Sequence, residues 1–448
     1  MSAEDSSPTL SHRSCSDIAD LGPDPPRGRK RKRQGDVRGA EGQEQEERQQ
    51  RRRLWQGEAA TLTTMTDRIR EGGRGRSGSH LQSQSPFANR PKLQPTPPST
   101  LLSRSRSRSQ SPVRISIRAM ETGFPPVRLD LASASSSTTG QPPAVVDRLV
   151  DVLVQDSGCA IPTSVRSLFQ AHDPRVARQT SDSAFTSDTQ LGTKAVWAQV
   201  QNIERRANKC FRRHMDEHAW CDVVQLVLQL ALGAAGGANP NFALEINNVQ
   251  SQAVDSAFLP QIRKHDGGGL RHVDKRTDFA IAVDTETGPH VDADPEQLFL
   301  SPMTDAYTAT LPLVCGLEVK RLDGSEEEAQ LQLMVWQTAM LAHLDYLRKI
   351  GGNPDLSLPP VVAWTVTNHS WRFYVAWKQL DGAVHVMRPF AQSTAASTAG
   401  TENTASIFIL LKLWTKLISW FETDYYPTYQ ALLRQADQAQ KAIDPLEL

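Results

Sequence analysis

Residues 311–321 read Leu-Pro-Leu-Val-Cys-Gly-Leu-Glu-Val-Lys-Arg, an apolar, β-prone run that carries an acid and a base. Side chains alternate between the two faces of a strand, so Glu318 and Lys320 share one face while Leu317 and Val319 lie on the other. Burying either charge alone costs several kcal/mol, and such a strand normally offers its charges to a partner, a metal ion or a cavity. We therefore expect a site on this face.

A long amphipathic helix is predicted directly after this strand. Ser325 and Glu328 form a capping box, and apolar residues then recur at helical spacing as far as Leu347. The pair Gly351-Gly352 is a stop signal. We predict a helix over residues 326–349.

An acid on one strand, Glu-x-Lys on the next strand and a helix directly afterwards are together similar to the PD-(D/E)XK nuclease superfamily. More narrowly, the chain resembles fungal proteins described as PD-(D/E)XK nuclease-like. The Glu-x-Lys is residues 318–320, and the acid of the first motif is Asp278 in the run Lys-Arg-Thr-Asp-Phe-Ala-Ile-Ala-Val. Thr277 stands where the pattern has proline. Asp274 and Asp284 flank the same strand and remain alternatives to Asp278.

A glutamine on the helix is a further part of the resemblance. Exonuclease-like branches carry Gln-x-x-x-Tyr there; Gln332 and Trp336 have that spacing, and Gln330 is a competing candidate. The resemblance covers roughly residues 145–435 and leaves the N-terminal part unassigned. It implies an α/β (α+β) fold with a restriction-endonuclease-like αβββαβ core, a mixed central sheet and extra flanking helices.

Periodicity supplies elements that fit this order. We expect one helical region, broken once at most, over residues 194–232, and a closing apolar helix over 405–421. The polar residues 284–310 form an insertion. Strands are predicted at residues 242–249, 279–283, 314–319, 361–367, 371–377 and 384–387.

The resemblance implies hydrolysis of phosphodiester bonds. Mg²⁺ or Mn²⁺ would be held by Asp278 and Glu318, with the backbone carbonyl of Val319 as a further ligand. Lys320 would orient or help deprotonate the water, and Gln332 would hold water or phosphate. Two plainer interpretations stay open: the acid and base form a buried structural ion pair, or the fold persists without activity.

A second metal hypothesis concerns Cys210, His214, His218 and Cys221, which are spaced along one helical face. Four ligands on one straight helix cannot enclose zinc tetrahedrally, so a structural role is favoured for them. Acids at positions 292, 294 and 296 are expected in a solvated loop.

Residues 1–140 have a composition unlike the rest. They hold 24 Lys and Arg against 15 Asp and Glu, which leaves 26 against 35 for residues 141–448. They are rich in Ser, Pro, Arg, Gly and Gln, and only Trp55, Phe87 and Phe124 of the aromatic residues fall there. We predict a disordered basic arm over 1–140, joined to a nuclease-like domain over 141–448, and expect the arm to bind nucleic acid or an acidic protein.

The arm also carries targeting signals. Residues 27–33, Arg-Gly-Arg-Lys-Arg-Lys-Arg from Arg27 to Arg33, have the form of a nuclear import signal, and residues 103–111 alternate Ser and Arg. Five scattered cysteines do not suggest a disulfide framework. There is no secretory signal, and no run that we expect to span a bilayer. We predict a nuclear, non-membrane protein of undetermined oligomeric state.

Overall fold

The computed structural model describes residues 112–131, 141–187, 191–235, 242–264, 268–286, 298–390 and 394–443. All of them belong to one compact unit, Arg104–Leu448. Three features noted in the sequence lie outside the described residues: the basic run at 27–33 with the form of a nuclear import signal, the Ser-Arg run at 103–111, and the acids at 292, 294 and 296.

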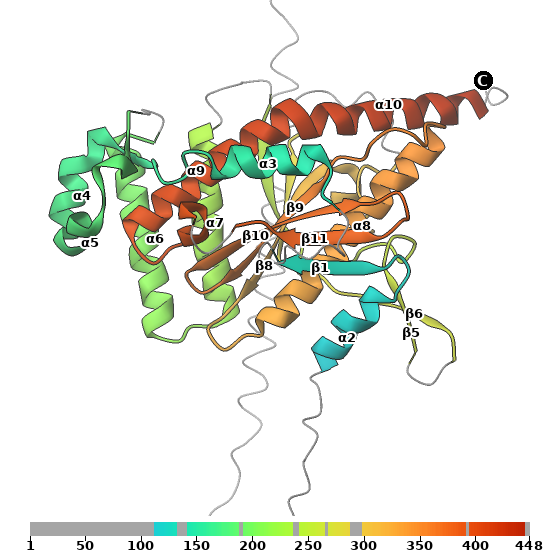
Figure 1. Cartoon of the computed structure of the whole chain (residues 1–448), viewed down its shortest axis with the longest axis horizontal. Coiled ribbons are helices and arrows are strands. Elements are labelled where there is room, and N and C mark those ends of the chain that lie inside the picture. The colour runs from blue at the N-terminus through green and yellow to red at the C-terminus, as the bar shows by residue number, and fades with distance from the viewer. Residues whose placement is uncertain are drawn as a thin grey trace, which may run out of the picture. The chain divides into compact units, whose positions relative to one another are not determined.

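A seven-stranded mixed sheet forms the centre of this unit (Figure 1), in the order β1-β11-β10-β9-β8-β7-β4. Strand β8, which lies inside the sheet, runs antiparallel to β7 and parallel to β9. The strands are β1 (Val127–Leu131), β4 (Leu244–Asn248), β7 (Phe279–Val283), β8 (Leu313–Lys320), β9 (Val361–Thr367), β10 (Ser370–Lys378) and β11 (Val384–Arg388).

Helix α8 (Glu326–Ile350) connects β8 to β9 and covers one face of the sheet. It begins where predicted, because the Glu328 N–H donates to Ser325 Oγ at 3.2 Å. Gly316 lets the helix lie close: a Cβ there would be 2.8 Å from the Trp336 ring. Gly316, Glu318 and Lys320 therefore share the face that α8 covers.

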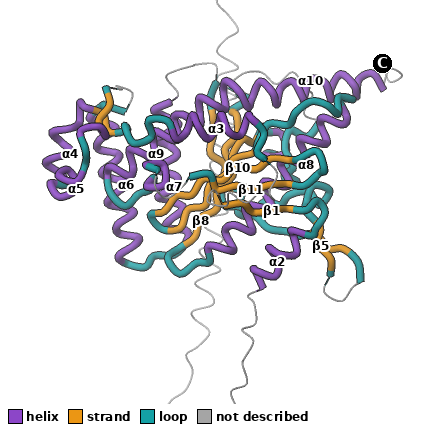
Figure 2. Tube along the Cα trace, viewed as in Figure 1, coloured by secondary structure: helices purple, strands orange, loops and turns teal. Residues whose placement is uncertain are grey.

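Further helices pack around the sheet (Figure 2). On the face opposite α8, Trp414 of α9 stacks on Trp364 of β9 with ring centroids 5.6 Å apart. The helices besides α8 are α2 (Pro112–Glu121), α3 (Ala144–Val154), α4 (Arg166–His172), α5 (Pro174–Gln179), α6 (Lys194–Arg212), α7 (Glu217–Ala235), α9 (Thr404–Trp420) and α10 (Tyr426–Ile443). Two small sheets pair β2 (Ile161–Pro162) with β3 (Phe185–Thr186), and β5 (Gln261–Arg263) with β6 (Leu270–His272).

The C-terminal helices are joined without a loop, through a short π-helical turn, Phe421–Tyr425. The stretch Thr404–Ala442 is long and apolar enough to cross a membrane, although we expected no such run from the sequence. In this fold 61% of its most apolar window is buried, as is usual for a core helix.

The predicted fold class is confirmed. The sheet is mixed, helices flank it, and β7 and β9 have the predicted bounds. The predicted helix after the central strand extends one residue further. The long helical region predicted at 194–232 is two helices, separated by residues 213–216.

The folded part begins earlier than the boundary predicted at residue 140. Strand β1 pairs in parallel with β11, from Val127 opposite Val384 onward, and so forms an edge of the central sheet. Met120 of α2 and Val127 are completely buried. Pairing with a strand some 250 residues away stabilises this segment, which its own composition did not reveal.

Candidate active site

The acid and the base of β8 form an ion pair inside the protein. The Lys320 Nζ lies 2.6 Å from Glu318 Oε1, and Glu318 is fully buried. Apart from this ion pair, neither oxygen of Glu318 has a hydrogen-bond partner among the described residues. A buried carboxylate normally fills its acceptor positions, so this one has room for another ligand.

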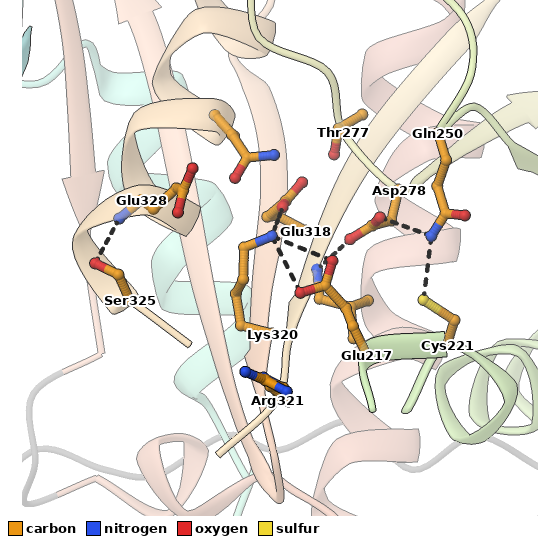
Figure 3. A network of polar contacts seen from close by, with 12 residues as sticks. Glu217, Cys221, Gln250, Thr277, Asp278, Glu318, Lys320, Arg321, Ser325 and Glu328 are labelled. Carbon is orange, nitrogen blue, oxygen red and sulfur yellow. Dashed lines mark hydrogen bonds and ion pairs between the residues drawn. The ribbon is translucent and has the colours of Figure 1, made fainter. Parts of the chain in front are cut away.

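Asp278 is attached to the same strand. Its Oδ2 accepts a 2.7 Å hydrogen bond from the Val319 N–H, and its Oδ1 accepts one of 2.8 Å from Gln250 Nε2. Thr277, in the place of the motif's proline, donates from Oγ1 to the Leu317 carbonyl oxygen at 2.7 Å. These bonds hold Asp278, at the start of β7, beside Glu318 on β8 (Figure 3).

The alternatives to Asp278 lie elsewhere. Asp274 is exposed, and Asp284 follows the other end of β7. Five strand residues span about 17 Å, so Asp284 cannot share a site with Glu318. Of the three aspartates, only Asp278 is next to the Glu-x-Lys strand.

Glu217 is a third acid of this site, and we did not predict it. Its Oε2 lies 3.3 Å from Lys320 Nζ, and Figure 3 shows its carboxylate near those of Asp278 and Glu318. It is the first residue of α7, which Asp216 caps by accepting from the Ala219 N–H at 3.0 Å. The one sequence signal was Asp216-Glu217 after a helix break, an N-cap followed by an acid in the first turn.

The four ionisable groups affect one another. Burial raises the pKa of Glu318 well above its ordinary value, and Asp278 raises it further, while Lys320 lowers it. Burial also raises the pKa of Asp278, against its two hydrogen bonds and Lys320. Burial lowers the pKa of Lys320, but the surrounding acids outweigh burial and raise it overall. With its three carboxylates ionised, the group carries a net charge of −2, which one divalent cation would neutralise.

The donor set fits a hard divalent cation. Such ions take carboxylate and carbonyl oxygens, and the two buried oxygens of Glu318 have only Lys320 as a partner among the described residues. The Val319 N–H points toward Asp278, and the carbonyl of a strand residue points to the same side in an antiparallel pair. Among the described residues, no three His, Cys, Asp or Glu side chains lie so that together they could hold a metal ion. At most two of these acids would therefore bind a cation directly, and water or phosphate would fill its other positions.

Gln332 lies on α8 with its Nε2 donating to the Arg276 carbonyl oxygen at 2.9 Å, while its Oε1 is buried and has no hydrogen-bond partner among the residues that the structure describes. Gln330 has its partners outside the site of Asp278 and Glu318: its Nε2 donates to Glu326 and to the Tyr374 hydroxyl, at 3.2 Å each. Between the two glutamines, Gln332 is therefore nearer to the entrance of β7. Its role with water or phosphate stays a prediction.

The four-residue zinc hypothesis fails on geometry. Helix α6 ends at Arg212 and α7 begins at Glu217, so Cys210 and Cys221 are on different helices. His214 lies in the turn between them with a positive φ of 47°. Both cysteines are buried, which agrees with the structural role favoured from sequence.

The comparison with protein families agrees with this arrangement. A model of the PD-(D/E)XK nuclease superfamily matches residues 165–426, which include Asp278, Glu318, Lys320 and the Glu217 helix. No curated protein matches the chain. The family match spans more than half of the 448 residues. The chain therefore belongs to the PD-(D/E)XK nuclease superfamily.

Proposed function

We propose that this protein is a nuclease that hydrolyses phosphodiester bonds of DNA or RNA with the help of Mg²⁺ or Mn²⁺. One observation carries the proposal: Asp278 is held by the Val319 N–H beside the buried Glu318, whose oxygens have no partner in the described part of the chain other than Lys320. Buried ionisable groups with strongly shifted pKa values cluster at functional sites.

The acids and the Val319 carbonyl would hold the cation. When bound, it would neutralise charge on the phosphate and make a water molecule acidic enough to attack. The raised pKa of Lys320 keeps its amine protonated at neutral pH. Lys320 would thus orient the water and offset the negative charge that develops on the phosphate, rather than remove a proton.

Substrate would approach on the Glu217 side. Glu318 is fully buried and the Lys320 side chain is 10% exposed, whereas the Glu217 side chain is 38% exposed. Glu217 thus forms the solvent-facing margin of the site, and the phosphate would meet Lys320 there before the deeper acids.

Cleavage by the full chain tests the proposal. We expect DNA or RNA to be cut with Mg²⁺ or Mn²⁺, not with EDTA, and we expect Lys320→Met to remove the cleavage. Lys378→Met is the matched control, because Lys378 is on β10, is 20% exposed and is paired with Asp345 on α8. No cleavage of any substrate by the wild-type chain, or equal cleavage by Lys320→Met, would contradict the proposal.

A second candidate function is a nuclease-like scaffold that binds nucleic acid or protein through its basic arm. The charge division favours it: residues 1–140 have a net charge of +9 and the remainder −9. Binding by the arm would weaken steeply with salt, would not need metal, and would be lost on deleting residues 1–111. Binding that survives the deletion would contradict this candidate.

We also propose that residues 27–33 direct the protein to the nucleus through the import machinery. Replacing the basic residues there with glutamine should leave a fluorescent fusion outside the nucleus. An unchanged distribution would contradict the proposal.

A further inference from the structure

Two rows of polar side chains lead away from the acid pair across the sheet. In the strand register, Glu318 is opposite Thr365, and Thr365 is opposite Arg372. Directly paired residues point to the same face, so all three lie on the face that α8 covers. The distance from the Glu318 Cα to the Arg372 Cα is therefore two strand spacings, about 10 Å.

The second row is parallel to the first. Lys320 is opposite Thr367, and Thr367 is opposite Ser370, again on the α8 face. The hydroxyls of Thr365 and Thr367 are buried and have no hydrogen-bond partner among the described residues. Valine would fill these positions without leaving a polar atom unpaired, so the hydroxyls indicate a ligand or water between the acids and β10.

The rows end at a cationic cavity of about 370 Å³. Arg372 and Arg388 line it, and their side chains are 31% and 28% exposed. Trp371 also lines it, and its Nε1–H is buried without a hydrogen-bond partner in the described part of the chain. The side chains that line the cavity include no acid, and Phe373 and Phe390 stack on one another at its wall. The cavity thus offers hydrogen-bond donors, positive charge and aromatic surface.

The two arginines of the cavity are already paired with one carboxylate, that of Glu326. Arg372 forms an ion pair with Glu326 Oε1, and Arg388 lies 3.6 Å from the same oxygen. Two guanidinium groups and one carboxylate leave a net charge of +1. A planar, five-donor guanidinium suits phosphate as well as carboxylate, so an incoming phosphate can share or replace Glu326.

We propose that the Arg372 and Arg388 cavity is a subsite for a second phosphate of the nucleic-acid substrate, next to the phosphate that is cut. The subsite rests on the proposed function only for the identity of its ligand. Arg372 and Arg388 bind the phosphate, the partly exposed Phe390 packs against the adjacent sugar or base, and the two threonine hydroxyls hold water between the subsite and the acids. The strand being cut then follows the second row, where Thr367 is partly exposed and Ser370 is exposed, because Thr365 of the first row is buried under α8.

Binding without cleavage tests the subsite separately from catalysis. Binding of a 5′-phosphorylated thymidine dinucleotide to the full chain is measured by calorimetry in EDTA, which prevents cleavage. Any binding by the basic arm is the same in every variant, so differences between variants report on the subsite. We expect Arg372→Gln to weaken binding about tenfold, as for loss of one charge-assisted hydrogen bond. Thr367→Val should weaken it less. Glu326→Gln should leave binding equal or tighter, because it frees both arginines.

Lys378→Gln is the matched control. Lys378 lies on the same face of β10 and is likewise paired with an α8 acid, Asp345, but it is outside this cavity. We expect its binding to match wild type within about twofold. If Arg372→Gln melts below the assay temperature, Arg388→Gln replaces it.

Three results would overturn the subsite: no binding by the wild-type chain, equal binding by Arg372→Gln and Lys378→Gln, or loss of binding in Glu326→Gln as great as in Arg372→Gln. Arg372-dependent binding without cleavage would leave the subsite standing and contradict the nuclease activity. Cleavage together with binding that does not depend on Arg372 would support the nuclease activity and contradict the subsite.

Discussion

The N–H of Val319 donates to Oδ2 of Asp278 at 2.7 Å, so the first acid is attached to the strand that carries the second. The bond comes from the backbone, and it therefore fixes the acid pair whether or not a cation is bound. The backbone of Asp278 is also held by β8, because its own N–H donates to the Leu317 carbonyl oxygen at 3.1 Å. The site is thus built by the β7 and β8 ladder rather than by a flexible loop, as precise positioning requires.

Replacing Glu318 with glutamine should remove a pH-dependent effect of metal on stability. The folded pKa of Glu318 is raised above its ordinary value of 4.5, so the folded state holds more protons than the unfolded state above that pH. The free energy of unfolding then falls as pH rises through this window, and a cation that binds the ionised form restores it. We expect Mn²⁺ to raise the melting temperature more at pH about 8 than at pH about 5.

In Glu318→Gln, the metal-free protein should be less sensitive to pH over this range, and Mn²⁺ should leave its melting temperature unchanged. Differential scanning fluorimetry at the two pH values measures both effects. A metal-induced shift that persists in Glu318→Gln would show that the cation binds elsewhere.

Gln250→Met should shift the pH profile of cleavage. The Gln250 Nε2 donates to Asp278 Oδ1, and this hydrogen bond lowers the pKa of Asp278 against the larger effect of burial. Its loss should move the acidic limb of kcat/KM up by about one pH unit. Gln252→Met is the control, since Gln252 bonds to the Thr308 hydroxyl instead. Identical acidic limbs in the two variants would mean that Asp278 does not limit the rate.

Glu217→Gln should weaken metal binding without unfolding the protein. Glu217 is partly exposed and contributes one negative charge beside Lys320, so we expect roughly tenfold lower affinity for Mn²⁺ and a similar loss of cleavage at low metal concentration. Excess metal should restore the rate. Asp222→Asn, an exposed acid on the same helix, should behave as wild type. Equal metal affinities in the two variants would leave Glu217 as a partner of Lys320 alone.

The sequence was sufficient for the elements whose pattern is local. Strand β8 could be predicted from alternation, and α8 from its capping box and periodicity, because both signals lie within one segment. Alternation likewise predicted a strand over residues 371–377, which lies within β10. The period of a strand placed Glu318 and Lys320 on one face; the ion pair that they form was one of the interpretations that the sequence left open.

The features that the sequence missed depend on contacts between distant segments. Strand β1 is stable because β11 offers it an open edge, and α2 because its Met120 is completely buried in the core. Glu217 reaches Lys320 because the turn at His214 redirects α7, and a positive φ at histidine has no clear sequence signal. Local periodicity contains none of these relationships.

Gly316→Ala should destabilise the fold by about 1–3 kcal/mol through overpacking. The added Cβ would lie 2.8 Å from two ring atoms of Trp336, which is completely buried between α8 and the sheet. Denaturant unfolding measures the loss. In the double variant with Trp336→Leu, the destabilisation should be smaller than the sum of the two single effects, because the smaller side chain makes room. Gly233→Ala is the control: it is helical with nothing within 4 Å, and should be neutral or stabilising. Additive effects would contradict the close contact.

His343 should make the fold sensitive to mild acid. It is fully buried, its Nε2 lies 3.0 Å from the Phe299 carbonyl oxygen, and burial lowers its pKa from 6.5 to about 4 despite that bond. Between these values the unfolded chain takes up a proton that the folded chain refuses, so stability is lost as pH falls, by on the order of 3 kcal/mol. Asp345, with a pKa lowered to about 2, acts only below its ordinary 3.8 and so outside this window. The raised pKa of Glu318 gives a contribution of opposite sign, which is the same in wild type and in His343→Leu and so leaves the difference between them unchanged.

His343→Leu should therefore lose some stability at pH about 7, with its hydrogen bond, yet change less than wild type between pH about 6.5 and about 4. Urea unfolding at the two ends of this range gives the difference directly. His272→Leu removes an exposed histidine of β6 and should keep the wild-type pH dependence. If His343→Leu also keeps the wild-type pH dependence, the acid sensitivity arises from groups other than His343.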